Sequence, residues 1–346
     1  MNASAPARWE LQLLPYPYLL FLGDTTEPTL AKTAFGLRDW IPERCVGEWR
    51  CPEGTVSTGL PRLTPQEARA RGARALVIGV ANMGGFIDER WVPFLVEALE
   101  AGLDLVSGLH AKLADVPRVA AAAARCGRAL IDVRVPPPNI PIATGRKRTG
   151  KRLLTVGTDC ALGKKYTALA LARALAARGR AADFRATGQT GILIAGGGMP
   201  MDAVVADFEA GAAEMLSPDA AADHWDVIEG QGSLLHPAYA AVSLGLLHGS
   251  QPDVFVVCHQ PGREHVHGYP DYPIPSISET IELTALLGGR TNPAIRCAGV
   301  SLNTSHLNPI EARDLLVRES GQLRLPVADP MRPGREFERL VDSCLA

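Results

Sequence analysis

The segment LLTVGTDCALGKKYT at residues 153–167 decides the fold of the second half of the chain. Its first apolar residues predict a buried strand, which leads into a turn containing Gly157 and Gly163, and a helical pattern follows from Lys164. Glycines let the backbone curl so that successive N–H groups face an anion, and the helix N-terminus adds partial positive charge. The segment therefore predicts a phosphate-binding turn. The residues expected to hold a phosphate-bearing cofactor are Gly157, Thr158, Asp159, Cys160, Ala161, Leu162, Gly163, Lys164, Lys165 and Thr167.

The turn departs from the standard phosphate-loop pattern in two ways. Five residues separate the two glycines instead of four, and Lys165 stands where that pattern has Ser or Thr. The spacing resembles the loop of dethiobiotin synthetase and related P-loop ligases. Because the hydroxyl that normally holds Mg²⁺ is missing beside Lys164, we expect no metal site. An ordinary glycine-rich turn between a strand and a helix is the alternative interpretation.

Apolar runs alternate with amphipathic segments on both sides of a proline-rich stretch at residues 135–141. This alternation predicts an α/β protein with parallel sheets, and 346 residues suffice for two domains. We expect a Rossmann-like domain at residues 1–134, a linker at 135–150 and a P-loop domain at 151–346. The predicted strands are 18–22, 75–80, 104–106, 130–133, 153–156, 226–228, 254–257 and 295–300. The predicted helices are 30–40, 89–101, 116–126, 164–178, 201–214, 237–247, 277–287 and 309–320.

The composition excludes several classes of function. The chain has 35 Lys and Arg against 37 Asp and Glu, a formal net charge of −2, which argues against nucleic-acid binding. No apolar run approaches the ~18 residues that a membrane-spanning helix needs, and no signal-peptide pattern is present. Seven cysteines without zinc-ligand spacing indicate reduced thiols in the cytoplasm. We expect a small-molecule substrate and a homo-oligomer.

Three predicted strand ends carry titratable side chains, and ligands of α/β sheets bind at such ends. Glu229, His236 and His259 are the candidate catalytic acids or bases. A solvated acid and a histidine that caps or packs a helix start remain alternatives for the first two. Arg263 is a candidate for binding an anionic substrate. The histidines around it match no zinc pattern, and Cys160 is either a nucleophile or a packing residue.

Small and polar residues follow the strand that is expected before residue 186. The segment Ala186-Thr187-Gly188-Gln189-Thr190-Gly191 predicts either a substrate loop or a flexible turn. Asp202 caps a helix or takes part in chemistry. Asn303 either contacts an adenine edge or forms a turn. The candidate substrate-binding residues are Lys32, Thr187, Gly188, Gln189, Thr190, Gln231 and Arg263.

These motifs together resemble one protein family. The N-terminal half contributes Gly23-Asp24-Thr25, Ala31-Lys32-Thr33-Ala34, the glycine-rich residues 79–85 and Gly108-Leu109-His110, and the C-terminal half contributes the motifs described above. Over residues 15–340 the chain resembles the DgcN-type D-glutamate N-acetyltransferases, a P-loop family long classed as a domain of unknown function. The resemblance implies acetyl-CoA as donor, D-glutamate as acceptor and a role in D-amino-acid breakdown.

The resemblance and the residues combine into one hypothesis. The P-loop cradles the pyrophosphate of CoA without hydrolysing it, Lys32 or Arg263 pairs with a substrate carboxylate, and Glu229 or His236 deprotonates the amine. Backbone N–H groups near Gly188 or Gly232 stabilise the oxyanion. An ATP- and Mg²⁺-dependent ligase or kinase and a non-catalytic nucleotide-binding regulator are the alternatives. A dehydrogenase is disfavoured because no Gly-x-Gly-x-x-Gly follows the first strand.

Overall fold

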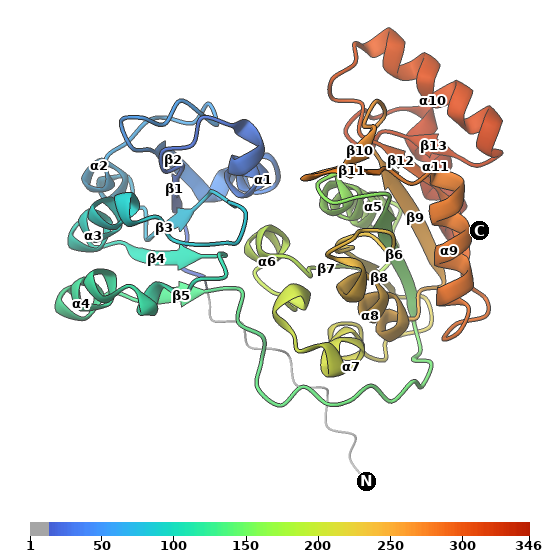
Figure 1. The fold of residues 1–346 in the computed structure, drawn as a ribbon, viewed down its shortest axis with the longest axis horizontal. Helices are drawn as coiled ribbons and strands as arrows, with labels where there is room; N and C mark the ends of the chain where they lie inside the picture. The colour runs from blue at the N-terminus through green and yellow to red at the C-terminus, as the bar shows by residue number, and fades with distance from the viewer. Residues whose placement is uncertain (1–13) are drawn as a thin grey trace. The chain divides into compact units, whose positions relative to one another are not determined.

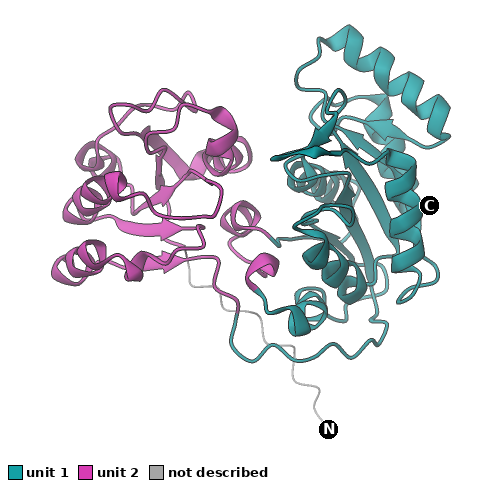
Figure 2. Ribbon diagram, viewed as in Figure 1, with its two compact units in different colours: residues 1–6, 137–187, 204–346 teal, residues 7–136, 188–203 magenta. Residues whose placement is uncertain are grey.

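The computed structural model describes residues 14–346, and these residues form two compact units (Figure 2). The N-terminal unit contains the described residues up to 136 together with 188–203. The C-terminal unit contains residues 137–187 and 204–346. The start of the expected first domain, residues 1–13, lies outside the described range. The sequence did not indicate that residues 188–203 would pack with the N-terminal unit.

The N-terminal unit is built on a five-stranded parallel sheet in the order β2-β1-β3-β4-β5. Helices α2, α3 and α4 lie on one face of the sheet, and α1 and α6 lie on the other (Figure 1). The strands are β1 (Tyr18–Phe21), β2 (Cys45–Trp49), β3 (Ala75–Ile78), β4 (Asp104–Ser107) and β5 (Leu130–Asp132). The helices are α1 (Lys32–Trp40), α2 (Pro65–Ala70), α3 (Val92–Glu100), α4 (Pro117–Cys126) and α6 (Gln189–Ala195).

The C-terminal unit is built on a six-stranded parallel sheet in the order β13-β12-β9-β6-β8-β7. Its strands are β6 (Lys151–Gly157), β7 (Ala182–Arg185), β8 (Trp225–Ile228), β9 (Val254–His259), β12 (Arg296–Leu302) and β13 (Val327–Ala328), and β10 (His265–Val266) pairs antiparallel with β11 (Tyr269–Pro273). Its helices are α5 (Lys164–Ala177), α7 (Glu209–Leu216), α8 (Ala240–Ser250), α9 (Ile277–Gly288), α10 (Pro309–Leu323) and α11 (Arg335–Leu345). Because β6 is central and fully paired, its carboxyl end lies between those of β8 and β9.

All eight predicted strands are present, and most predicted helices are present with shifted ends. The predicted helix at 201–214 is wrong, because two 3₁₀ turns precede α7, which begins only at Glu209. The β-branched pair Val204-Val205 lies at the break, and such residues have low helix propensity. The prediction missed β2, α2, α6, β10, β11, β13 and α11.

The glycine-rich segment after Thr187 forms helix α6, not the flexible turn that was one expectation. The hydroxyl of Thr190 on α6 lies 3.0 Å from that of Thr33 on α1, within the N-terminal unit. Helix α6 also packs closely on Gly108, which follows β4. Only glycine fits there, because a Cβ would lie 2.2 Å from the side-chain oxygen of Gln189. The missing side chain of Gly108 therefore lets α6 pack closely against the N-terminal unit.

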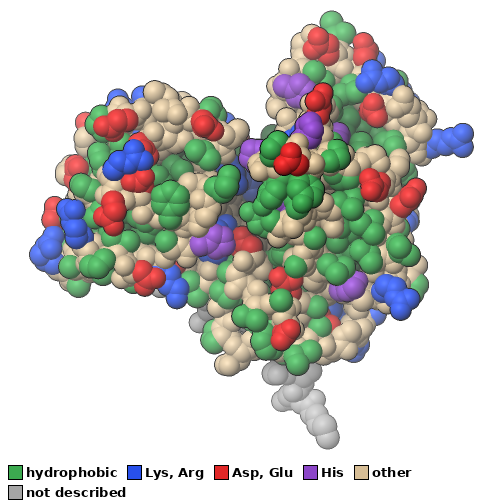
Figure 3. Space-filling model, viewed as in Figure 1, with side chains coloured by type: hydrophobic (Ala, Val, Ile, Leu, Met, Phe, Trp, Pro, Cys, Tyr) green, Lys and Arg blue, Asp and Glu red, His purple; other side chains and the backbone are tan. Residues whose placement is uncertain are grey.

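The surface charges and the helices of the structure agree with the composition of the sequence. Acidic and basic side chains are interspersed over the visible face of each unit (Figure 3), in accord with the net charge of −2. Within residues 14–346, no helix combines the length and the apolar composition that crossing a bilayer requires.

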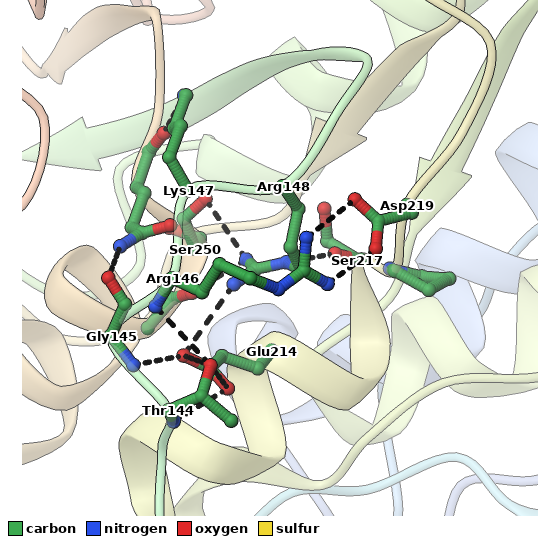
Figure 4. Close-up of polar contacts among 12 residues, drawn as sticks. Thr144, Gly145, Arg146, Lys147, Arg148, Glu214, Ser217, Asp219 and Ser250 are labelled. Carbon is green, nitrogen blue, oxygen red and sulfur yellow. Dashed lines mark hydrogen bonds and ion pairs between the residues drawn. The ribbon is translucent and has the colours of Figure 1, made fainter.

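The basic end of the expected linker is packed into the C-terminal unit through Arg148 (Figure 4). The buried guanidinium of Arg148 donates to the carbonyl oxygens of Ser217 at 2.6 Å and Gly249 at 2.7 Å. It also lies 3.6 Å from the carboxylate of Glu214. Burial, together with the neighbouring Arg152, lowers the pKa of Arg148 to about 10. This side chain thus joins the entry of β6 to the ends of α7 and α8.

We predict that Arg148→Met lowers the free energy of unfolding of the C-terminal unit by about 3 kcal/mol, because it removes the side-chain donor from the carbonyl oxygens of Ser217 and Gly249 and the cation beside Glu214. Arg146→Met is the matched control, since Arg146 forms an exposed ion pair with Asp219, and such pairs contribute little. Calorimetric unfolding of both variants measures the difference. Equal melting temperatures would show that Arg148 does not stabilise the unit.

Candidate functional site

Three of the predicted motifs follow adjacent strands at one edge of the six-stranded sheet. The phosphate turn follows β6, the segment from Glu229 follows β8, and the segment from His259 to Arg263 follows β9. Since β6 pairs with both β8 and β9 in parallel, the three loops leave the sheet on the same side. The C-terminal unit therefore brings together most of the candidate residues.

The phosphate turn has the backbone conformation of an anion cradle. Ala161 and Gly163 have φ angles of +54° and +108°, which turn successive N–H groups toward one side. Among the described residues, the N–H groups of Ala161, Leu162 and Gly163 have no hydrogen-bond partner. The ammonium of Lys164 donates to the carbonyl oxygen of Asp159 at 2.7 Å and is largely buried. An anionic ligand would supply acceptors for these donors.

The carboxylate of Asp159 fixes the turn to the loop after β9. It is fully buried and accepts hydrogen bonds from the guanidinium of Arg263 at 2.7 Å and from the backbone N–H of His267 at 2.8 Å. Arg263 also donates to the carbonyl oxygen of Cys160 at 2.9 Å and to the side chain of Gln260 at 2.8 Å. Asp159 thus acts through the protein and not as a direct phosphate ligand.

This arrangement favours a structural role for Arg263, and its expected contact with a substrate stays a prediction. Both terminal nitrogens of its guanidinium already bind protein acceptors, and its side chain is only 17% exposed. We assign Arg263 to holding the turn in shape, because a substrate carboxylate would have to displace the buried Asp159. No local sequence pattern indicates that Arg263 and Asp159 pair, since the two residues lie 104 positions apart.

Thr167 was expected to contact the cofactor, but its hydroxyl points into the protein. It lies 2.7 Å from the hydroxyl of Ser301 on β12 and 3.4 Å from the sulfur of Cys258 on β9. The residue is 2% exposed. With Lys165 beside Lys164, no hydroxyl of α5 is placed as the Mg²⁺ ligand of an NTPase would be. This geometry favours a structural role for the hydroxyl of Thr167, and its expected contact with the cofactor stays a prediction.

Glu229 binds Thr187, the residue at which the chain leaves the C-terminal unit. Its carboxylate accepts the N–H of Thr187 at 2.9 Å, and its carbonyl oxygen accepts the hydroxyl of Thr187 at 2.7 Å. The side chain of Gln231 donates to the same hydroxyl at 2.9 Å. This geometry favours a positioning role for Glu229, with Thr187 and Gln231 as its partners.

His236 is 2% exposed and has no nitrogen free to take a proton. Its Nδ1 accepts the N–H groups of Ala238 and Tyr239 at 3.0 and 3.2 Å, which places the proton of a neutral ring on Nε2. Nε2 lies 3.6 Å from Asp159. Burial lowers the pKa of His236, and the carboxylate of Asp159 opposes that shift. A role for His236 as general base is disfavoured by this arrangement.

His259, at the end of β9, is the histidine whose surroundings suit a general base. Its Nδ1 lies 2.9 Å from the hydroxyl of Thr158 at the start of the phosphate turn, and the ring is partly exposed. Burial and the positive charge of Arg263 lower the pKa of His259, so the imidazole is neutral at pH 7. When Nδ1 donates to Thr158, the Nε2 lone pair is available to accept a proton.

The donor atoms of Asp159, Cys160 and His236 lie within 4.8 Å of one another, a spacing that a transition metal accepts. Arg263 neutralises the carboxylate of this group at 2.7 Å. A bound cation would therefore lie beside a guanidinium and close to Lys164, which opposes binding. The three side chains are of types that bind metals, but the positive charges of Arg263 and Lys164 beside them oppose a bound cation.

The remaining candidates are divided between the two units. Asn303 follows β12 in the C-terminal unit, and its side-chain oxygen accepts the N–H of Ser305 at 3.2 Å, as in a turn. Lys32 begins α1, and Gln189 and Thr190 begin α6, all in the N-terminal unit. Their binding roles stay predictions.

We predict that His236 makes the protein less stable in acid. Because its pKa is lower in the folded state than in the unfolded chain, the unfolded state binds more protons as the pH falls below about 6.5. His236→Asn keeps an acceptor near the two N–H groups without titrating, and the fall in melting temperature between pH 7.5 and 5.5 should shrink. His248→Asn on α8 is the control and should keep the wild-type fall. An unchanged fall in H236N would contradict the prediction.

Comparison with known proteins agrees with both units. The P-loop domain of a family of unknown function, DUF1611, matches residues 141–341, and its Rossmann-like N-terminal domain matches residues 44–136. The crystal structure of a DUF1611 family protein from Anabaena variabilis has a TM-score of 0.86 and 34% identity, and covers 95% of this chain and 99% of its own.

Two curated relatives match almost from end to end. A D-glutamate N-acetyltransferase of Tritonibacter scottomollicae is 51% identical over 334 residues, 96% of this chain and 100% of the relative. A protein of the same name from a Pseudoalteromonas species is 48% identical over 336 residues, 97% of this chain and 99% of the relative. The α/β fold with a Rossmann-like and a P-loop domain is thereby confirmed, and the chain belongs to the DUF1611 family, as its motifs predicted.

Proposed function

We propose that this protein transfers an acetyl group from acetyl-CoA to the amine of D-glutamate, as an acyltransferase of D-amino-acid catabolism. The activity and the acceptor rest on the two relatives named D-glutamate N-acetyltransferase, which match nearly the whole chain at about half identity. The donor rests on the phosphate turn. The proposal places the protein in the cytoplasm, since its seven cysteines are all free thiols. It also takes the protein to be a homo-oligomer.

One observation carries the choice of acetyl-CoA over ATP. The turn offers unpartnered N–H groups and Lys164 to a pyrophosphate, yet the hydroxyl of Thr167 is bound to Ser301 and Lys165 replaces the usual metal ligand. Phosphoryl transfer depends on a metal that neutralises the developing charge, whereas holding the pyrophosphate of CoA does not. The geometry therefore favours a turn that binds phosphates and leaves them intact.

The chemistry needs a base, because the α-amine of an amino acid is mostly protonated at neutral pH. We assign this role to His259, whose lowered pKa keeps it neutral. It accepts one proton from the ammonium, and the free amine then attacks the thioester carbonyl carbon. The attacking nitrogen then loses its second proton to solvent, and the tetrahedral intermediate collapses as the carbon–sulfur bond breaks. The proton held by His259 passes to the departing thiolate, so that one proton is released for each acetyl group transferred. The products are N-acetyl-D-glutamate and CoA.

The first test is release of the CoA thiol from acetyl-CoA without ATP or Mg²⁺, over a panel of D- and L-amino acids, with the product identified by mass. Release with D-glutamate and none with L-glutamate supports the proposal. If no amino acid releases CoA, and ADP forms once ATP and Mg²⁺ are supplied with an acceptor, the protein is a ligase or kinase instead.

We predict that Lys164→Met raises KM for acetyl-CoA about 10- to 100-fold and changes KM for the amino acid little, because the lost contact is to the CoA phosphates. Lys151→Met is the control, since Lys151 lies exposed at the opposite end of β6. Steady-state kinetics with each substrate varied in turn measures both constants. An unchanged KM for acetyl-CoA in K164M would remove the turn from donor binding.

We predict that His259→Asn lowers kcat by about 10²- to 10⁴-fold, the usual contribution of a general base. In the wild type, kcat should hold as the pH falls below about 6.5 and drop only when His259 takes up its proton, since its pKa is lowered. A pH profile of kcat tests both points. His236→Asn should retain far more activity than H259N, because the accepting nitrogen of neutral His236, Nδ1, is already bonded to two backbone N–H groups. The opposite order would transfer the catalytic role to His236.

A further inference from the structure

An arginine of the N-terminal unit is buried without enough partners. Arg134 follows β5, and its side chain is 12% exposed. Its guanidinium lies 3.2 Å from the carboxylate of Asp202, which is 27% exposed. Among the described residues this is its one ion pair, and its Nε has no hydrogen-bond partner. A guanidinium carries five N–H donors, and buried donors are nearly always paired, so Arg134 has donors to spare.

The surroundings of Arg134 are the carboxyl edge of the five-stranded sheet, where open α/β sheets bind ligands. His110 follows β4, and burial together with the charge of Arg134 lowers the pKa of this imidazole. Gly85, on the loop after β3, packs on His110 so closely that a Cβ would lie 2.7 Å from the ring. The oxygen of Asn82 on the same loop is buried and has no partner within residues 14–346.

The segment that carries Asp202 brings a further polar group to this edge. Gln189 of α6 packs on Gly108, just after β4, and its side-chain oxygen is buried without a partner in the described chain. Three unsatisfied polar atoms thus lie on loops or elements at the carboxyl edge of one sheet. They belong to Asn82, Arg134 and Gln189. Such groups destabilise a protein unless a ligand or water completes their hydrogen bonds.

We propose that Arg134 and Asp202 bind the α-carboxylate and the α-ammonium of the amino-acid acceptor, an inference that rests on the proposed acetyl transfer for the identity of that acceptor. An α-amino acid carries a carboxylate and an ammonium on one carbon, and Arg134 and Asp202 present the complementary charges side by side. The guanidinium fork suits a carboxylate, and the buried oxygens of Asn82 and Gln189 are acceptors for N–H donors. The amino acid is captured as the zwitterion and loses its proton in the later chemical step.

A purely structural role is the competing explanation. The Arg134–Asp202 pair joins the segment 188–203 to the sheet, and a tether alone would affect stability but no ligand. Arg128 provides the comparison, because it lies just before β5, at the opposite edge, and its guanidinium lies 3.8 Å from Asp104. The same substitution at each arginine therefore changes a guanidinium that is paired with one aspartate, at the two opposite edges of the same sheet.

The test is calorimetric titration of the full chain with three ligands. They are D-glutamate, glutarate, which lacks the ammonium, and γ-aminobutyrate, which lacks the α-carboxylate. We expect the wild type to bind D-glutamate most tightly. Arg134→Lys, which keeps the charge and loses the fork, should weaken D-glutamate about 10- to 100-fold, and Arg128→Lys should not. Asp202→Asn, an isosteric change, should weaken D-glutamate and leave glutarate unaffected.

Steady-state kinetics supplies a second readout that a tether would not move. R134K should raise KM for D-glutamate and leave KM for acetyl-CoA unchanged, at a melting temperature close to that of R128K. Equal D-glutamate affinity in R134K, R128K and the wild type would overturn the inference, as would equal losses of D-glutamate and glutarate in D202N.

Failure of the proposed function gives a different pattern. If the wild type acetylates no amino acid but binds one of a panel of α-amino acids, and R134K weakens that binding while R128K does not, the zwitterion site stands without acetyl transfer. If the wild type acetylates D-glutamate and R134K leaves both KM and affinity unchanged, acetyl transfer stands and the site is wrong. If the wild type binds no α-amino acid, the site is wrong as well.

Discussion

The buried carboxylate of Asp159 is the constraint on which the phosphate turn depends. A charge with no exposure is costly unless ionic and hydrogen-bond partners compensate it. The partners of Asp159 are Arg263 and the N–H of His267, which come from the loop and short strand after β9. The turn after β6 and the loop after β9 are therefore held in one shape. A change in either would leave a buried charge uncompensated.

That shape decides what the turn can bind. Lys164 is held on the carbonyl oxygen of Asp159, and the N–H groups of residues 161–163 have no partner within the described residues. The hydroxyl of Thr167, the first Ser or Thr hydroxyl on α5, joins this helix to β9 and β12 through Cys258 and Ser301. In nucleotide-hydrolysing enzymes, the P-loop fold supplies a Ser or Thr hydroxyl that binds Mg²⁺. In this chain the turn keeps the donors for a phosphate but has no such hydroxyl beside Lys164.

A second constraint lies where the chain passes between its units. Glu229 binds the backbone and the hydroxyl of Thr187, the last residue before the chain enters the N-terminal unit. The next residues form α6, whose polar side chains pack on α1 and on Gly108. A carboxylate at a strand end, which sequence reasoning favours as a base, is thus committed to the backbone. We therefore propose His259, whose imidazole has a lowered pKa, as the group that takes the proton of the amine.

The sequence by itself determined most strands of the two parallel sheets, their alternation with helices and the phosphate turn. These depend on local patterns, since apolar runs predict buried strands and glycines beside a lysine predict an anion cradle. It also indicated that His259 and Glu229 lie at strand ends, which the parallel sheet brings together. Only the tertiary structure decided which of these side chains remain available. Arg263, Thr167 and Glu229 are occupied by partners far away in the chain, and no local pattern encodes such partners.

The same reason explains what the sequence missed. Residues 188–203 have the composition of a loop, but their packing against α1 and β4 makes α6 and places Asp202 beside Arg134. Helix formation there depends on tertiary burial, which overrides weak local propensity. Arg134 stands alone between a short strand and a run of prolines, so its burial and its spare donors are properties of the folded unit. Periodicity reports which residues face a core, and only the fold determines which charges meet.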